Sequence, residues 1–200
     1  MVLGAALLCA ALTLFLRNRQ EDTSAQEAAV AVMPQLVQQI QENTATEAAP
    51  DLTQDLLIPV ELLTQEDVEM PEVQVLGNGY IGYLTIPDLG LELPILGSWS
   101  YPKLQIAPCR YTGSIRGQDL VLMAHNYSCH FGRISQLDLG DRLTFTDMDG
   151  EKILYEVQVI DVLQPTAVDA VKNSDFDLVL YTCTYGGESR VVVFCNRVKL

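Results

Sequence analysis

The chain from about Gly77 to Leu200 is divided into short apolar runs by Gly, Pro and Asp residues. Short runs of aliphatic and β-branched residues bounded by turn formers are typical of β-strands. Only two short helices are expected, near Phe131–Leu137 and Thr166–Lys172, so this part is predicted to be all-β, as a barrel or a sandwich. The predicted strands are Ile81–Ile86, Leu91–Ile95, Leu120–Ala124, Arg142–Thr146, Ile153–Leu163, Leu178–Cys183 and Arg190–Val198.

An uncharged apolar run, Val2–Leu16, opens the chain. It has 15 residues, whereas a full membrane span needs about 20. No A-x-A cleavage site precedes Arg17, which favours a membrane anchor with its first residues missing over a signal peptide, although both interpretations fit. Arg17 and Arg19 favour a cytoplasmic location for the part that follows, so the side of the membrane is inferred from the chemistry of the domain.

The next part of the chain is rich in acidic residues. A helix is expected over Ser24–Glu42, kinked or divided at Pro34, followed by a solvated linker that is partly helical around Leu62–Val68. Residues 1–76 carry a net charge of −10 of the chain's −14, and this acidity argues against a nucleic-acid-binding protein. The predicted division is a membrane anchor at 1–20, a helical and acidic stalk at 21–76, and a β-rich domain at 77–200.

The five cysteines do not form Cys-x-x-Cys pairs, which makes a zinc ribbon or a dense disulfide framework unlikely in this chain. Cys183 ends one predicted strand, and Arg190 begins the next after a six-residue loop with two glycines. If these strands pair antiparallel, the thiol and the guanidinium lie opposite each other. A guanidinium favours the thiolate and can hold a developing oxyanion, so the pair is a candidate nucleophilic site.

Two further residues of the strand that begins at Arg190 are not expected to take part in this site. Arg197 lies seven residues beyond Arg190, which places it about 24 Å away along a strand and on the opposite face. Cys195 also stands at an odd offset from Arg190 and is predicted to pack as a small hydrophobic residue.

A cysteine nucleophile usually needs a base or a proton donor. The chain has two histidines. His125 directly follows an apolar strand, in a position like that of Cys183, whereas His130 leads into a short helix as a loop or capping residue. We therefore select His125 as the catalytic candidate. The two histidines with Cys129 do not make a clear metal-ligand set.

Several motifs in this order resemble the sortase family, the membrane-anchored cysteine transpeptidases of Gram-positive bacteria. Leu180–Cys183 matches the family's Leu-x-Thr-Cys signature, Ala124–Asn126 matches the segment with the family's histidine, and Arg190 matches the family's arginine. Gly82–Pro87 resembles the first strand of the domain. The resemblance covers about 77–200, nearly the whole domain.

The resemblance implies a closed eight-stranded β-barrel, preceded by an N-terminal membrane helix and a stalk, with the catalytic domain outside the cell. It implies cleavage of a Leu-Pro-x-Thr-Gly-like sorting signal between Thr and Gly. Cys183 would form a thioacyl intermediate, His125 would transfer protons, and Arg190 would hold the oxyanion or the substrate backbone. Thr182, with Ala124 and Asn126, is expected to bind substrate; ordinary strand packing is the equal alternative for Thr182.

The family chemistry requires no metal and no cofactor. The expected partners are surface proteins or pilins with a C-terminal sorting signal, and an amine acceptor from lipid II, peptidoglycan or a pilin lysine. The short loop Thr184–Ser189 is more like that of class B or unclassified pilin-type members than that of the housekeeping class. Cys109 and Cys129 are expected in loops, and both a disulfide between them and two free thiols stay open.

Two other classes of protein compete with this interpretation. A different envelope cysteine enzyme, such as an L,D-transpeptidase or a papain-like endopeptidase, would act on peptidoglycan. An L,D-transpeptidase would have a Ser-x-Gly-Cys-type motif, which is absent around Cys183, and a papain-like enzyme usually has its cysteine before its histidine. The other alternative is a non-catalytic, anchored β domain.

Overall fold

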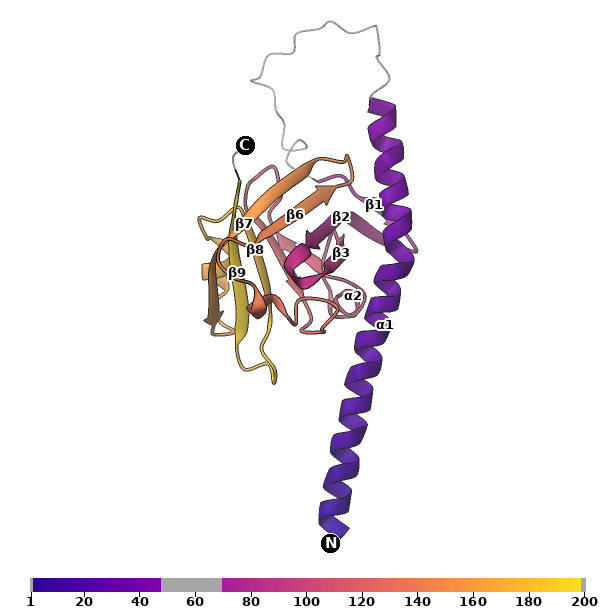
Figure 1. The fold of residues 1–200 in the computed structure, drawn as a ribbon, viewed down its shortest axis with the longest axis vertical. Coiled ribbons are helices and arrows are strands. Elements are labelled where there is room, and N and C mark those ends of the chain that lie inside the picture. Colours follow the sequence, from indigo (N-terminus) through magenta and orange to yellow (C-terminus); the bar gives the residue numbers. More distant parts are fainter. Residues whose placement is uncertain (1, 48–69, 199–200) are drawn as a thin grey trace, which may run out of the picture.

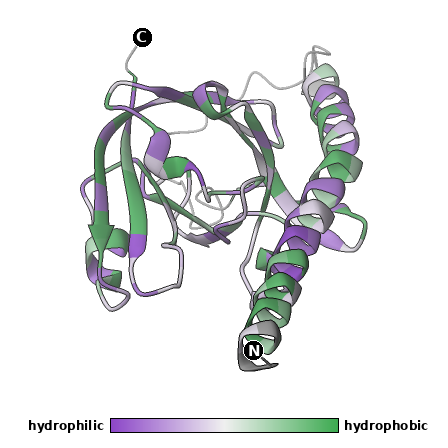
Figure 2. Ribbon diagram, turned by 60° about the horizontal axis from the view of Figure 1, so that its bottom comes forward, coloured by the Kyte–Doolittle hydropathy of each residue, from purple (hydrophilic) through white to green (hydrophobic). Residues whose placement is uncertain are grey.

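The structure is a computed structural model that describes residues 2–47 and 70–198. Eight strands close into a barrel, because β2 pairs with β3 on one side and with β6 on the other (Figures 1 and 2). A ninth, short strand, β1, pairs with the beginning of β2. The strands are β1 (Val73–Val75), β2 (Asn78–Ile86), β3 (Leu91–Leu96), β4 (Cys109–Thr112), β5 (Leu120–Ala124), β6 (Arg142–Asp147), β7 (Lys152–Leu163), β8 (Leu178–Cys183) and β9 (Arg190–Arg197).

The strand order around the barrel is β2-β3-β4-β5-β8-β9-β7-β6. Two neighbouring pairs are parallel, β3 with β4 and β5 with β8, and the others are antiparallel. The parallel pairing of β5 with β8 aligns the C-terminal ends of the two strands, because Ala124 pairs with Thr182. Short helical turns connect the strands: η3 (Pro87–Leu89), α2 (Tyr101–Leu104), η4 (Ile134–Gln136) and α3 (Val168–Lys172).

The two faces of the barrel wall bury different sets of apolar side chains. Successive side chains of a strand point to opposite faces, and in β8 Leu178 and Leu180 point into the main core inside the barrel. Val179 points outward, where it packs with Val171 of α3 and with Phe194 of β9. The crossover from β7 to β8 therefore covers the outer face of the β5-β8-β9 wall.

The predicted closed eight-stranded barrel is confirmed, and each of the seven predicted strands is present with similar bounds. The strand β4 was not predicted. Its four residues are too few for an alternating pattern to stand out, and its pairing with β5 is interrupted by a bulge. The interpretation of residues 43–75 as linker was wrong at both ends. The helix α1 continues to Glu47, Met70 is buried in the main core, and β1 lies on the barrel.

The N-terminal part is one long helix, α1 (Val2–Glu47), which lies along the outside of the barrel and extends past it (Figure 1). The predicted division at Pro34 was wrong, since α1 continues through this residue. Val32, Leu36 and Ile40 pack in a second core with Tyr80 of β2. These contacts on both sides of the proline stabilise the helix, so this part of the expected stalk is packed on the domain.

The boundary expected between anchor and stalk at residue 20 is not marked by a break in α1. Among the described residues, we find no helix with both the length and the apolar character needed to cross a membrane. The expected helical segment Leu62–Val68 lies outside the described residues.

Candidate active site

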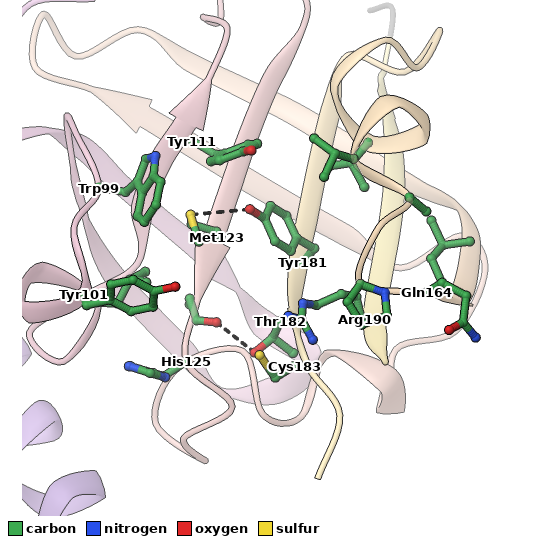
Figure 3. A pocket seen from close by; sticks show the side chains of 17 residues that line it. Trp99, Tyr101, Tyr111, Met123, His125, Gln164, Tyr181, Thr182, Cys183 and Arg190 are labelled. Carbon is green, nitrogen blue, oxygen red and sulfur yellow. Dashed lines mark hydrogen bonds between the residues drawn. The ribbon is translucent and has the colours of Figure 1, made fainter. Parts of the chain in front are cut away.

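Three neighbouring strands bring together the three residues that the sequence singled out. Cys183 ends β8 and pairs with Arg190 at the beginning of β9, which confirms the predicted cross-strand pair. His125 directly follows Ala124, the last residue of β5, whose partner in β8 is Thr182. His125 is the first residue after β5, and continuing the same register places it beside Cys183. In Figure 3 the thiol lies between the imidazole and the guanidinium.

The alternation of side chains places this group outside the barrel. Thr182 is buried, and its hydroxyl donates a hydrogen bond to Ala124 O at 2.8 Å. Cys183 follows it and is half-buried on the outer face. The Thr182 hydrogen bond joins the ends of β5 and β8, so it stabilises the relative position of His125 and Cys183.

A cavity of about 260 Å³ adjoins Cys183, His125 and Arg190 on this outer face. Its floor is the β5-β8-β9 wall, and one side is formed by the segment from Leu163 to Val171. The opposite side is formed by aromatic residues, which Figure 3 shows across the cavity from Arg190. The aromatic and thioether lining consists of Trp99, Tyr101, Tyr111, Met123 and Tyr181.

The aromatic side of the cavity is a connected cluster. The Trp99 ring contacts those of Tyr101 and Tyr111, with centroids 6.0 and 5.9 Å apart. Tyr111 contacts Tyr181 at 5.6 Å, and the Tyr181 hydroxyl reaches Met123 Sδ at 3.4 Å. Such a surface can bury apolar groups of a ligand.

This aromatic lining was not predicted from the sequence. Met123 and Tyr181 each stand two residues before His125 and Cys183, so the period of two in a strand could have found them. Trp99 and Tyr101 lie in the connection after β3, where no local pattern indicates that they approach the site.

The His125 ring is half-buried, and its surroundings act on its pKa in opposite directions. Burial lowers the pKa below the ordinary histidine value, and the carboxylate of Glu21 raises it in part. The ring also stacks against Tyr127, with centroids 4.9 Å apart. The Arg190 guanidinium is held by the loop before it, since Nη1 donates to Gly187 O and Ser189 O, each at 3.0 Å.

The residues that were set aside lie away from the cavity. His130 is fully buried, and its burial, together with the nearby His125, lowers its pKa to about 4, so its ring is neutral at neutral pH. Cys195 is buried in the main core, as predicted, and burial raises its pKa. Arg197 lies at the far end of β9, where it pairs with Tyr155.

Ala124 and Thr182 both line the cavity. Asn126 is exposed and does not line it. It lies in a second hollow between α1 and the β8–β9 loop, with Asp22 and Tyr185. Its amide reaches Thr184 O at 3.5 Å, which links the loop after His125 to the loop after Cys183.

The thiols of Cys109 and Cys129 are free. Cys109 is buried in β4 instead of in a loop, so this part of the prediction was wrong. Burial raises the pKa of both thiols to about 12. Within residues 2–47 and 70–198, no three His, Cys, Asp or Glu side chains are grouped so that they could hold a metal ion.

A half-exposed thiol beside an imidazole and a guanidinium, at the edge of an apolar cavity, has the groups that covalent catalysis by cysteine requires. The imidazole can exchange a proton with the thiol, and the guanidinium can stabilise negative charge. A closed β-barrel with such a site is typical of one class of protein, the cysteine enzymes that transfer acyl groups.

Comparisons with known proteins agree with this class. The Sortase domain family matches residues 84–198. The chain resembles sortase C1 of Streptococcus agalactiae, with 28% identity and a TM-score of 0.55 over 64% of this chain and 72% of that one. It also resembles sortase C1 of Streptococcus suis, with 27% identity and a TM-score of 0.53 over 60% and 74%.

A third similar structure is Clostridium perfringens sortase C with the C-terminal cell wall sorting motif, with 25% identity and a TM-score of 0.55 over 82% and 88% of the two chains. No curated protein gives a significant match. Since the family match covers more than half of the chain, the protein belongs to the sortase family. It is a sortase-type cysteine transpeptidase, and the similar solved structures are of the sortase C type.

Proposed function

We propose that Cys183, His125 and Arg190 carry out the transpeptidation, on a Leu-Pro-x-Thr-Gly-like sorting signal. The observation that carries this proposal is the pairing of Cys183 with Arg190 next to His125, at the open edge of an apolar cavity. The sorting motif of the similar Clostridium perfringens structure supports a substrate of this kind. Thr182, Ala124 and Asn126 are proposed to support substrate binding.

In the first step, the Cys183 thiol transfers its proton to His125, and the thiolate attacks the carbonyl carbon of the signal's Thr. The Arg190 guanidinium donates hydrogen bonds to the resulting oxyanion. When the C–N bond to Gly breaks, His125 returns the proton to the departing amine, and the Thr acyl group stays on sulfur as a thioester.

In the second step, an acceptor amine attacks the thioester carbonyl and loses a proton to His125. The C–S bond breaks and a new amide bond forms. The Cys183 sulfur then takes the proton back from His125, which restores the thiol and the neutral imidazole. The acceptor is proposed to be an amine of lipid II, of peptidoglycan or of a pilin lysine. The aromatic side of the cavity is suited to the apolar Leu-Pro part of the signal.

We propose that the enzyme works outside the cell, at the outer face of the cell membrane, and that the apolar part of α1 holds it there as a single membrane-spanning segment. Leu7, Leu8, Leu12, Leu14, Phe15 and Leu16 are all exposed, between 56% and 74%. An apolar surface of this kind favours contact with lipid.

The substrate is tested by incubating the full-length chain with a sorting-signal peptide and an amine acceptor, and in parallel with muropeptides. We expect a transfer product in which the peptide is cut after Thr and joined to the amine. Turnover of muropeptides in preference to the signal peptide would contradict the proposal and favour an L,D-transpeptidase or a papain-like endopeptidase.

Replacing Arg190 with alanine is expected to lower kcat/KM by about 10²–10³-fold, the usual effect of losing one oxyanion donor. The loss should appear mainly in kcat, because the guanidinium acts on charge that develops in the transition state. Steady-state kinetics of signal-peptide cleavage measure it. Arg197→Ala, on the same strand but away from the cavity, serves as the control and should retain kcat/KM per folded molecule.

A further inference from the structure

One face of α1 is directed toward the catalytic domain along much of the helix. Ala25, Val32, Leu36 and Ile40 are buried on it, at spacings of seven, four and four residues. Such spacings repeat along one side of a helix. One turn before Ala25, the same face presents Glu21 and Asp22, which lie four and three residues earlier, respectively.

Asp22 binds the loop that begins directly after His125. Its carboxylate accepts hydrogen bonds from the Ser128 hydroxyl and, at 3.2 Å, from Cys129 N. The Cys129 thiol donates to the backbone oxygen of Asp22 at 3.3 Å. Burial raises the pKa of Asp22, but the hydrogen bonds outweigh this and lower it below the ordinary value. Asp22 is therefore ionised, and its hydrogen bonds attach the loop to α1.

Glu21 reaches His125 through one aromatic ring. The Tyr127 hydroxyl donates to Glu21 Oε2 at 3.3 Å, and the Tyr127 ring stacks against the His125 ring at an angle of 31°. The other carboxylate oxygen, Oε1, accepts from Arg17 Nε at 3.1 Å. Glu21 thus fixes the ring against which the catalytic imidazole rests.

We propose that Glu21 and Asp22 are positioning residues that hold His125 in the orientation in which it serves Cys183. This inference rests on the proposed catalytic role of His125. His125 lies just beyond the end of β5, where the ladder of the barrel stops. The contacts from α1 therefore hold its loop together with the hydrogen bond from Asn126 to Thr184 O. The turn of α1 that carries Glu21 and Asp22 then helps to position a catalytic side chain.

The charged and titratable groups around His125 come from every neighbouring element. They are Glu21 of α1, Tyr127 and His130 of its own loop, Cys183 of β8 and Arg190 of β9. The Glu21 carboxylate favours the protonated imidazole. Removing this charge is expected to lower the pKa of His125 further below the ordinary value.

The test uses the full-length chain with Glu21→Gln, Asp22→Ala and Asp22→Asn, and with Glu27→Gln as the matched control on an exposed position of the same helix. The His125 ring resonances are titrated by NMR, and kcat and KM are measured with the signal peptide. We expect Glu21→Gln to lower the His125 pKa. Both Glu21→Gln and Asp22→Ala should lower kcat by about 10-fold to 100-fold, the scale of a small misplacement of a catalytic group.

Asp22→Asn should restore part of the kcat lost in Asp22→Ala, because its amide oxygen can still accept from the loop, and Glu27→Gln should match the parent. Unchanged kcat and His125 pKa in both Glu21→Gln and Asp22→Ala would overturn the inference while leaving the proposed function intact. If the parent does not cleave the peptide, the proposed function fails, and the NMR titration still decides whether α1 acts on His125. If Asp22→Ala does not fold, Ser128→Ala removes the same contact from the loop side.

Discussion

Replacing Cys183 with alanine is expected to abolish cleavage of a sorting-signal peptide and to leave the fold intact. Cys183 is half-buried at the end of β8, outside both the main core and the second core, so the smaller side chain leaves no large void. Without the sulfur no thioester can form. Removal of a covalent nucleophile typically costs on the order of 10⁶ in kcat, which places the variant below detection in a peptide assay.

The control for this variant is Cys195→Ala, because Cys195 is a buried thiol on the neighbouring strand. Truncating a core side chain is expected to lower the melting temperature, while kcat/KM of the folded molecules stays near the parent value. Normal turnover by Cys183→Ala, with a circular dichroism spectrum like that of the parent, would exclude Cys183 as the nucleophile.

Replacing His125 with alanine is expected to lower kcat/KM by about 10²–10⁴-fold, the usual contribution of a positioned general acid and base. The departing amine then leaves without a proton donor, and the acceptor amine lacks a base. The pH dependence of kcat/KM is also expected to change. In the parent, burial lowers the pKa of His125, so the part of the pH profile that reports this group should lie at a pH below the ordinary histidine pKa. The variant should lose this part of the profile.

His130→Ala separates the two histidines. Its ring is fully buried, so the alanine leaves a cavity and the melting temperature falls, whereas activity per folded molecule is retained. A His130 variant that folds but loses several orders of activity, beside a His125 variant that is near normal, would reverse the assignment.

The barrel wall around the site could be predicted from the sequence because its strands are continuous apolar runs with clear ends. Leu120–Ala124 and Leu178–Cys183 are buried on both faces for most of their length and carry no charge. Cys183 and Arg190 flank a short loop with two glycines, so an antiparallel pairing of the two strands would place them opposite each other. The structure confirms this arrangement, because β8 and β9 are antiparallel and Cys183 pairs with Arg190.

The parts that escaped prediction depend on contacts between distant segments. Trp99 and Tyr101 reach the cavity because β3 pairs with β4 and directs the connection between them over the outer face. The packing of α1 depends on a stripe of small and aliphatic residues, among them Ala25 and Leu36, that fits the barrel exterior. The acidic composition of this region suggested a solvated stalk, because composition does not show which face of a helix is buried.

The most direct measurement is the mass of the full-length enzyme after it is mixed with a sorting-signal peptide in the absence of an acceptor amine and quenched in acid. We expect the mass to increase by that of the acyl fragment ending in Thr, with the modification located on Cys183 by peptide mapping and released by hydroxylamine. An adduct on another cysteine, or cleavage of the peptide with no adduct in the parent and full activity in Cys183→Ala, would contradict the account.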